Sequence, residues 1–109
     1  MSIPLGSGSL ISTPSDINHF LFSVFNGAIL SQESLKLMTI FKDDVGIGII
    51  PLEIENHSGW AFVGGIDGFV CIYLYLPELE SCVTCCFNAV NDDSDEVLIR
   101  ILRLYFEQK

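Results

Sequence analysis

Hydrophobic residues recur at helical spacing in the first third of the chain. Thr13 is predicted to be the N-cap of a helix, with Pro14 at its first position and Gly27 ending it. A shorter helix is predicted from Gln32 to about Ile40, with Ser31 as its N-cap. The apolar positions behind these predictions are Ile17, Phe20, Leu21, Val24 and Phe25 in the first helix, and Leu35 and Met38 in the second.

The end of the chain shows the same helical spacing. Asp93 or Ser94 is predicted to cap a terminal helix, with acidic residues near its N-terminus. Its apolar stripe consists of Val97, Leu98, Ile101, Leu102 and Tyr105. Such a stripe predicts that one side of the helix packs against the rest of the protein.

Between the helical regions the pattern changes to runs of β-branched and aromatic residues. Three strands are predicted, at 45–54, 66–76 and 82–90, the first interrupted at Pro51. Residues 56–59 are predicted as a turn or the beginning of a strand, and 77–81 as a turn. The last two strands are apolar on both faces, so both faces need cover. The predicted fold class is α+β: an antiparallel sheet of about three strands, with two N-terminal helices on one face and a C-terminal helix on the other.

Composition adds that the protein is short of polar surface. Half of the 109 residues are hydrophobic and 17% are charged, whereas a typical soluble domain has about 25% charged residues. Residues 1–11 are predicted to be a flexible N-terminal segment, and 12–109 a single partial domain. The apolar excess predicts either assembly with another chain or membership of a larger fold.

The net charge of −9 argues against nucleic acid and acidic membrane surfaces as partners. No basic region followed by an apolar stretch begins the chain, so no signal peptide is predicted. The longest apolar run, 69–76, is too short to cross a bilayer. A cytoplasmic location is therefore expected for the chain as it stands.

Four cysteines occur, of which Cys82 and Cys85 have the spacing of a redox or metal pair. The other two cysteines are Cys71 and Cys86. On a strand, however, residues three apart, such as Cys82 and Cys85, point to opposite faces. All four are therefore predicted to be buried structural thiols in a reducing compartment, and no metal or cofactor is expected.

Several short motifs occur in the order found in one enzyme family. They are Ser12-Thr13-x-x-Asp16, Met38, Gly46-Ile47-Gly48, His57-Ser58-Gly59, residues 64–69, Pro77, Asn88 and the helix after Ser94. In this order they resemble the C-terminal part of the β-lactamase and penicillin-binding-protein-like serine hydrolases, the β-lactamase/transpeptidase-like fold. Members of that family act on β-lactams, D-Ala-D-Ala peptides or esters through an acyl-serine, and are often exported.

The resemblance implies that His57, Ser58 and Gly59 line a substrate cleft. In the family, the corresponding box holds the substrate carboxylate or the carbonyl under attack. The family nucleophile lies in a Ser-x-x-Lys motif, and no serine of this chain has a lysine three residues later. A Tyr-x-Asn motif is also missing, since Tyr73-x-Tyr75 does not match it. No catalytic residue is therefore assigned, and the chain is expected to be inactive alone.

Two other functions remain open alongside that of an inactive C-terminal segment. The first is a non-catalytic interaction module that binds through an exposed sheet edge, and the second is an enzyme with new chemistry. In the resembling family, strands from the N-terminal part lie beyond the final strand of the sheet. The strand at 82–90 is therefore expected to be an open edge, which predicts self-association as a homodimer or binding of a complementary N-terminal chain.

Overall fold

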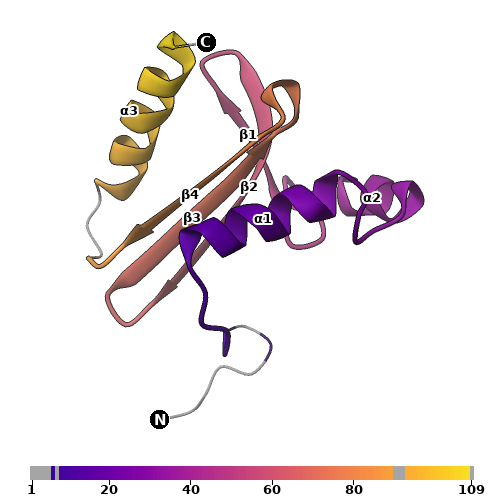
Figure 1. Ribbon diagram of the computed structural model, residues 1–109, viewed down its shortest axis with the longest axis horizontal. Helices are drawn as coiled ribbons and strands as arrows, with labels where there is room; N and C mark the ends of the chain where they lie inside the picture. The colour runs from indigo at the N-terminus through magenta and orange to yellow at the C-terminus, as the bar shows by residue number, and fades with distance from the viewer. Residues whose placement is uncertain (1–5, 7, 90–92, 109) are drawn as a thin grey trace.

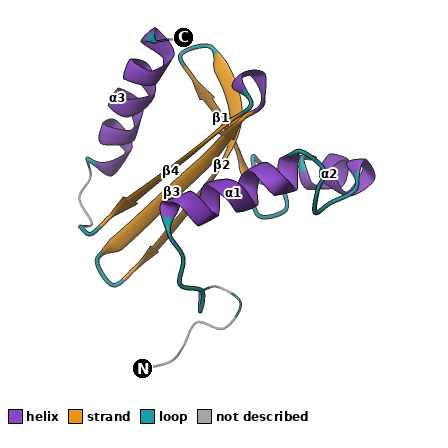
Figure 2. Ribbon diagram, in the orientation of Figure 1, coloured by secondary structure: helices purple, strands orange, loops and turns teal. Residues whose placement is uncertain are grey.

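The computed structural model describes residues 6, 8–89 and 93–108. It is an α+β structure in which two N-terminal helices precede a four-stranded antiparallel sheet, and a third helix follows it (Figures 1 and 2). The predicted fold class is confirmed at this level. Of the predicted flexible segment 1–11, residues 1–5 and 7 lie outside the described residues.

The two N-terminal helices begin where their capping residues predict. Helix α1 runs Pro14–Phe25, and the backbone N–H of Asp16 donates to the Thr13 hydroxyl at 3.2 Å. Helix α2 runs Gln32–Met38, with the N–H of Ser34 donating to the Ser31 hydroxyl. Each cap satisfies a backbone donor that the first helical turn leaves unpaired.

The sheet has four strands and not three. They are β1 (Ile50–Ile54), β2 (His57–Ile66), β3 (Phe69–Leu76) and β4 (Ser81–Phe87), in that order across the sheet. The prediction missed β2, and it joined the end of β2 to β3 as one strand. The predicted first strand also begins later, at Ile50, because an Asp43-Asp44 turn and a loop precede it. Val90, the predicted end of the last strand, lies outside the described residues.

Two tight hairpin turns account for the missed strand. Glu55 and Asn56 join β1 to β2 with φ of 50° and 66°, and Asp67 and Gly68 join β2 to β3 with φ of 44° and 89°. Positive φ at both central residues is the mark of the type I′ turn, whose twist suits a two-residue hairpin. The chain therefore reverses at Asp67-Gly68, inside what the apolar pattern suggests is a single strand.

One face of the sheet packs against α3 (Ser94–Glu107), which has Asp93 at its N-cap position as predicted, although the Asp93 side chain makes no capping hydrogen bond. The central residues of this core are Ala61, Ile72, Leu74, Leu76, Leu98 and Leu102, and Leu102 is completely buried. The opposite face packs against α1, where the Phe25 ring stacks on Tyr75 with centroids 4.5 Å apart. The Thr84 hydroxyl of β4 also donates to the Asn18 side-chain oxygen of α1 at 2.6 Å. Helices α1 and α3 thus cover opposite faces, as predicted, but α2, which was predicted to join α1 on its face, lies beyond the end of α1 (Figure 1).

Candidate functional site

The segment His57-Ser58-Gly59, singled out by the sequence, forms the beginning of β2. Alternation along the strand sends the side chains of His57 and Ser58 to opposite faces of the sheet. His57 lies on the α3 side, where its ring is 4.3 Å from that of Phe106. Ser58 is exposed and lies opposite Glu53 of β1. The structure therefore does not bring these two side chains together around one space.

The surroundings of His57 are acidic. Its Nδ1 lies 3.4 Å from Oε2 of Glu78, close enough for an ion pair. The His57 Nδ1 atom is buried, yet it forms no hydrogen bond, with Glu78 or with any other described residue. A carboxylate at this distance would repel the carboxylate of a substrate. His57 is thus poorly placed to hold an anionic substrate within the described part of the chain.

Gly59 has a structural reason to be glycine. It is buried, and a Cβ atom built on it would lie 2.6 Å from the carbonyl oxygen of Tyr75 and 3.0 Å from a methyl group of Leu76. Any side chain here would therefore push β2 away from β3. The missing side chain serves strand packing in this structure.

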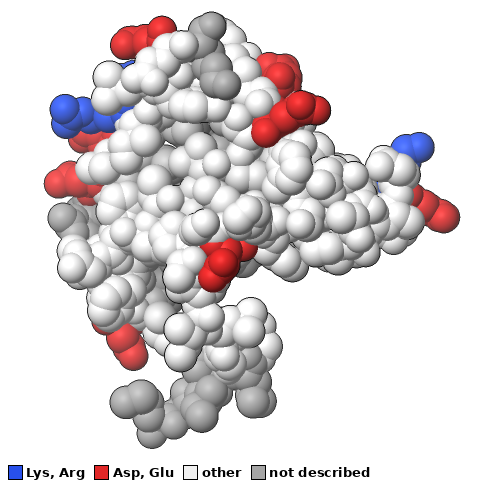
Figure 3. Space-filling model, in the orientation of Figure 1, with Lys and Arg blue, Asp and Glu red and all other residues white. Residues whose placement is uncertain are grey.

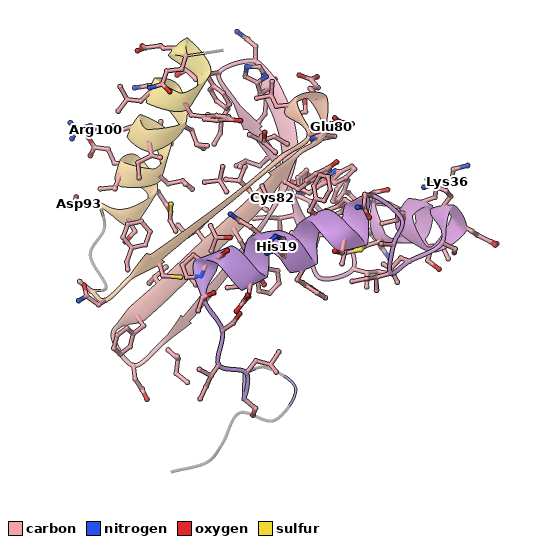
Figure 4. The ribbon with its side chains drawn as sticks, viewed as in Figure 1. His19, Lys36, Glu80, Cys82, Asp93 and Arg100 are labelled. Carbon is pink, nitrogen blue, oxygen red and sulfur yellow. The ribbon has the colours of Figure 1, made fainter. Side chains whose placement is uncertain are left out.

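Other groups capable of acid–base or nucleophilic chemistry are dispersed. Lys36 lies on α2, while Asp93, just before α3, and Arg100, on α3, lie on the other side of the sheet (Figure 4). Burial raises the pKa of the phenols of Tyr73 and Tyr75, which disfavours a phenolate-like base at either position. Within the described ranges, no three His, Cys, Asp or Glu side chains gather closely enough to hold a metal ion.

The cysteine spacing does not form a redox pair between Cys82 and Cys85. Cys82 lies opposite Tyr75 on the α1 side, whereas Cys85 packs with the core beneath α3. All four thiols are free. The prediction that all four are buried is wrong for Cys86, which is exposed, and the other three are only partly buried.

The most distinctive feature of the surface is the edge of the sheet at β4. In the described part of the chain, β3 is the only strand that pairs with β4. The seven residues of β4 include no proline and no charged residue. The opposite edge, β1, is shorter and carries Pro51, which has no N–H to donate, and the exposed Glu53. Proline and charge discourage strand addition, so β4 is the less protected of the two edges, although α1 packs against one face of it.

Helix α3 packs across one face of the sheet, as its contacts around the helix show. Successive residues are turned by about 100° around the axis. Arg103 donates to Glu55 at the β1–β2 turn, and Phe106 contacts His57 of β2. About a quarter-turn further round, the Tyr105 hydroxyl lies 2.7 Å from that of Ser81 in β4. Successive positions around the helix therefore face the β1–β2 turn, then β2, and then β4.

Continuing round α3 in the same direction leads past β4 to an apolar stripe made of Val97, Ile101 and Leu104. These side chains are 40%, 43% and 61% exposed. Figure 1 shows α3 along the sheet, with its C-terminal end beside the β1–β2 turn. The three side chains thus lie on the part of the helix surface that the sheet leaves exposed. The sequence showed the apolar stripe of this helix, but not that Val97 and Ile101 remain partly exposed.

The face of the molecule in Figure 3 shows no basic patch. In the face shown in Figure 3, acidic side chains are scattered and the few basic ones lie apart. Among the described residues, no helix has the length and apolar content needed to span a bilayer.

No protein-family model, curated protein or solved structure matches this chain.

Proposed function

We propose that this chain is the C-terminal segment of a β-lactamase-like serine hydrolase, that it carries no nucleophile of its own, and that its sheet is completed by a strand added at β4. The observation that carries the proposal is the β4 edge, which pairs only with β3 in the described part of the chain and is free of charge and proline. The exposed Val97, Ile101 and Leu104 on the neighbouring helix α3 add apolar surface that a partner could cover. In the resembling family the same edge is covered by strands from the N-terminal part.

The catalytic half of the proposal rests on missing chemistry. The chain contains no Ser-x-x-Lys, Ser58 is exposed next to Glu53, and His57 faces Glu78. Within the described residues, no hydrogen bond joins the Ser58 hydroxyl to a base, whereas a nucleophilic serine is activated by such a bond. Acyl-serine chemistry on β-lactam, peptide or ester substrates would need a nucleophile supplied by the complementary N-terminal part.

Incubation with a fluorescent penicillin tests this half. We expect no covalent labelling of the folded chain, and no turnover of chromogenic cephalosporin or ester substrates. Labelling of any serine, or turnover that the Ser58→Ala variant abolishes, would overturn the proposal that the chain lacks its own nucleophile.

A second candidate function is a non-catalytic interaction module that forms a homodimer through β4. The neutral composition of β4 favours it, because two copies can pair antiparallel about a two-fold axis without bringing like charges together. The exposed parts of Val97, Ile101 and Leu104 on α3 would add apolar area to such an interface. Complete burial of one aliphatic side chain contributes about 1.5–3 kcal/mol, so covering the exposed part of Leu104 corresponds to at most roughly tenfold in Kd.

Light scattering at micromolar concentration tests the dimer. We expect a dimer for the natural chain and a monomer for Leu104→Glu. Leu37→Glu is the matched control, since Leu37 is also an exposed helical leucine, at 56%, but lies on α2; it should remain dimeric. A monomeric natural chain, or equal weakening by both variants, would exclude dimerisation through β4.

A further inference from the structure

We propose that Cys71 and Cys86 form a modification site, a pair of thiols that a peroxide oxidises to a disulfide linking β3 to β4. The proposal is independent of whether the β4 edge binds a partner. It rests on the register of three strands and on the space around the two sulfur atoms.

The two cysteines lie directly opposite each other in the antiparallel pair of β3 and β4. Their Sγ atoms are 3.4 Å apart, in contact but not bonded. Opposite residues of such a pair have Cα atoms about 4.5–5.5 Å apart, which lies within the range of about 4.4–6.8 Å that disulfides adopt. The backbone therefore needs no large movement for the bond to form.

The residue beside this cysteine pair on the next strand leaves room for a reagent. On β2, the residue opposite Cys71 is Gly64, so no side chain covers the pair from that direction. Two residues further along on the same face, the position opposite Tyr73 holds a large side chain instead: the ring of Phe62 stacks on Tyr73, with centroids 5.3 Å apart. A hollow of about 640 Å³ opens beside the cysteines, and its walls include Gly64, Gly65, Ile66 and Phe69.

Burial assigns a different role to each thiol. Cys86 is exposed and accessible from the hollow. Burial raises the pKa of Cys71 to about 12, with a further contribution from its hydrogen bond to Cys86, so Cys71 remains a neutral thiol at physiological pH. The thiolate is the reactive form of cysteine. Cys86 is thus the thiol that meets the oxidant, and Cys71 the one that resolves the product.

The reaction proceeds in two balanced steps. Cys86 releases its proton to solvent, and the thiolate attacks one oxygen of hydrogen peroxide. The O–O bond breaks, a sulfenic acid forms, and the other oxygen leaves as hydroxide, which takes up the released proton to become water. Cys71 then gives up its proton and attacks the Cys86 sulfur. The S–S bond forms and the sulfenic oxygen leaves as a second water. The two thiols lose two electrons in total, which reduce one peroxide to two waters.

The test treats the fully reduced chain with hydrogen peroxide, followed by denaturation, alkylation, intact mass and peptide mapping. We expect a product that has lost two hydrogen atoms, takes up two alkyl groups instead of four, and contains a peptide joining Cys71 to Cys86. A product that keeps four alkylatable thiols at peroxide concentrations that oxidise free cysteine would overturn the proposal. A disulfide involving Cys82 or Cys85, or one between two chains, would also overturn it.

Variants separate the two roles. Cys71→Ser should stop at a sulfenic acid on Cys86 that dimedone traps, and Cys86→Ser should form no disulfide. Cys85→Ser is the matched control, because Cys85 lies next to Cys86 in the chain but on the opposite face, and it should form the disulfide as the natural chain does. Peptide mapping of the natural chain decides the pairing even where a variant fails to fold.

Discussion

Replacing Gly59 by alanine tests whether the glycine of the His57-Ser58-Gly59 box is required for the fold. The added Cβ would lie 2.6 Å from the carbonyl oxygen of Tyr75, a separation that real Cβ atoms essentially never show. Because the obstructing atom belongs to the backbone of β3, it cannot turn aside as a flexible side chain would. The sheet must therefore shift to accept one methyl group.

The size of the effect follows from the cost of overpacking, which is typically about 1–3 kcal/mol for an added carbon in a tightly packed interior. Gly64 in the same strand provides the matched control. Nothing lies within 4 Å of a Cβ built there, and its φ is not in the left-handed region. Since glycine costs about 0.5–1 kcal/mol relative to alanine inside a strand, Gly64→Ala should be neutral or slightly stabilising.

Urea unfolding followed by the fluorescence of Trp60, the single tryptophan, measures both variants. Trp60 is adjacent to Gly59 and lies 4.9 Å from the Phe25 ring, so its emission reports whether α1 stays packed on the sheet. With a slope of about 1–3 kcal/mol per molar urea, Gly59→Ala should lower the midpoint by roughly 1 M. Equal midpoints for Gly59→Ala and the natural chain would refute the packing argument.

Three further predictions concern the core, a helix cap and pH. Leu102→Ala should destabilise by about 2–5 kcal/mol in the same unfolding assay, because Leu102 is fully buried, whereas Leu104→Ala should change the monomer's stability little. Thr13→Ala should cost about 0.5–2 kcal/mol through loss of the bond to the Asp16 N–H; Thr13→Ser should restore it, and no difference between the two variants would contradict the capping role. The pKa of Cys71 rises from 9.0 to about 12 on folding, so stability should be unaffected below pH 9 and fall as the pH rises towards 12; Cys71→Ala should fall less steeply, and parallel pH profiles would contradict this.

Much of the fold follows from local sequence signals. Thr13 and Ser31 cap the helices they were expected to cap, and the terminal helix begins after Asp93. Opposite orientation of Cys82 and Cys85 also follows directly from strand alternation. These features depend on residues only a few positions apart, whose geometry the backbone sets once a helix or strand forms.

The missed strand β2 shows where local signals fail. Its glycines and the mixture of small and large residues from His57 to Ile66 resemble a connecting segment, and the Asp67-Gly68 turn lies inside an otherwise apolar run. What makes β2 a strand is its pairing with β1 on one side and β3 on the other. Hydrogen bonds to neighbouring strands stabilise it, and those partners are not visible in its own composition.

The sequence by itself determined the fold class, the helix caps and the absence of a Ser-x-x-Lys motif. Only the tertiary structure decided which residues meet. It separated the adjacent His57 and Ser58 onto opposite faces, brought Cys71 and Cys86 into contact across two strands, and left Val97, Ile101 and Leu104 of α3 partly exposed. The physical reason is that periodicity along a chain specifies which side of an element is apolar, whereas strand register and helix docking set the distances between residues far apart in sequence.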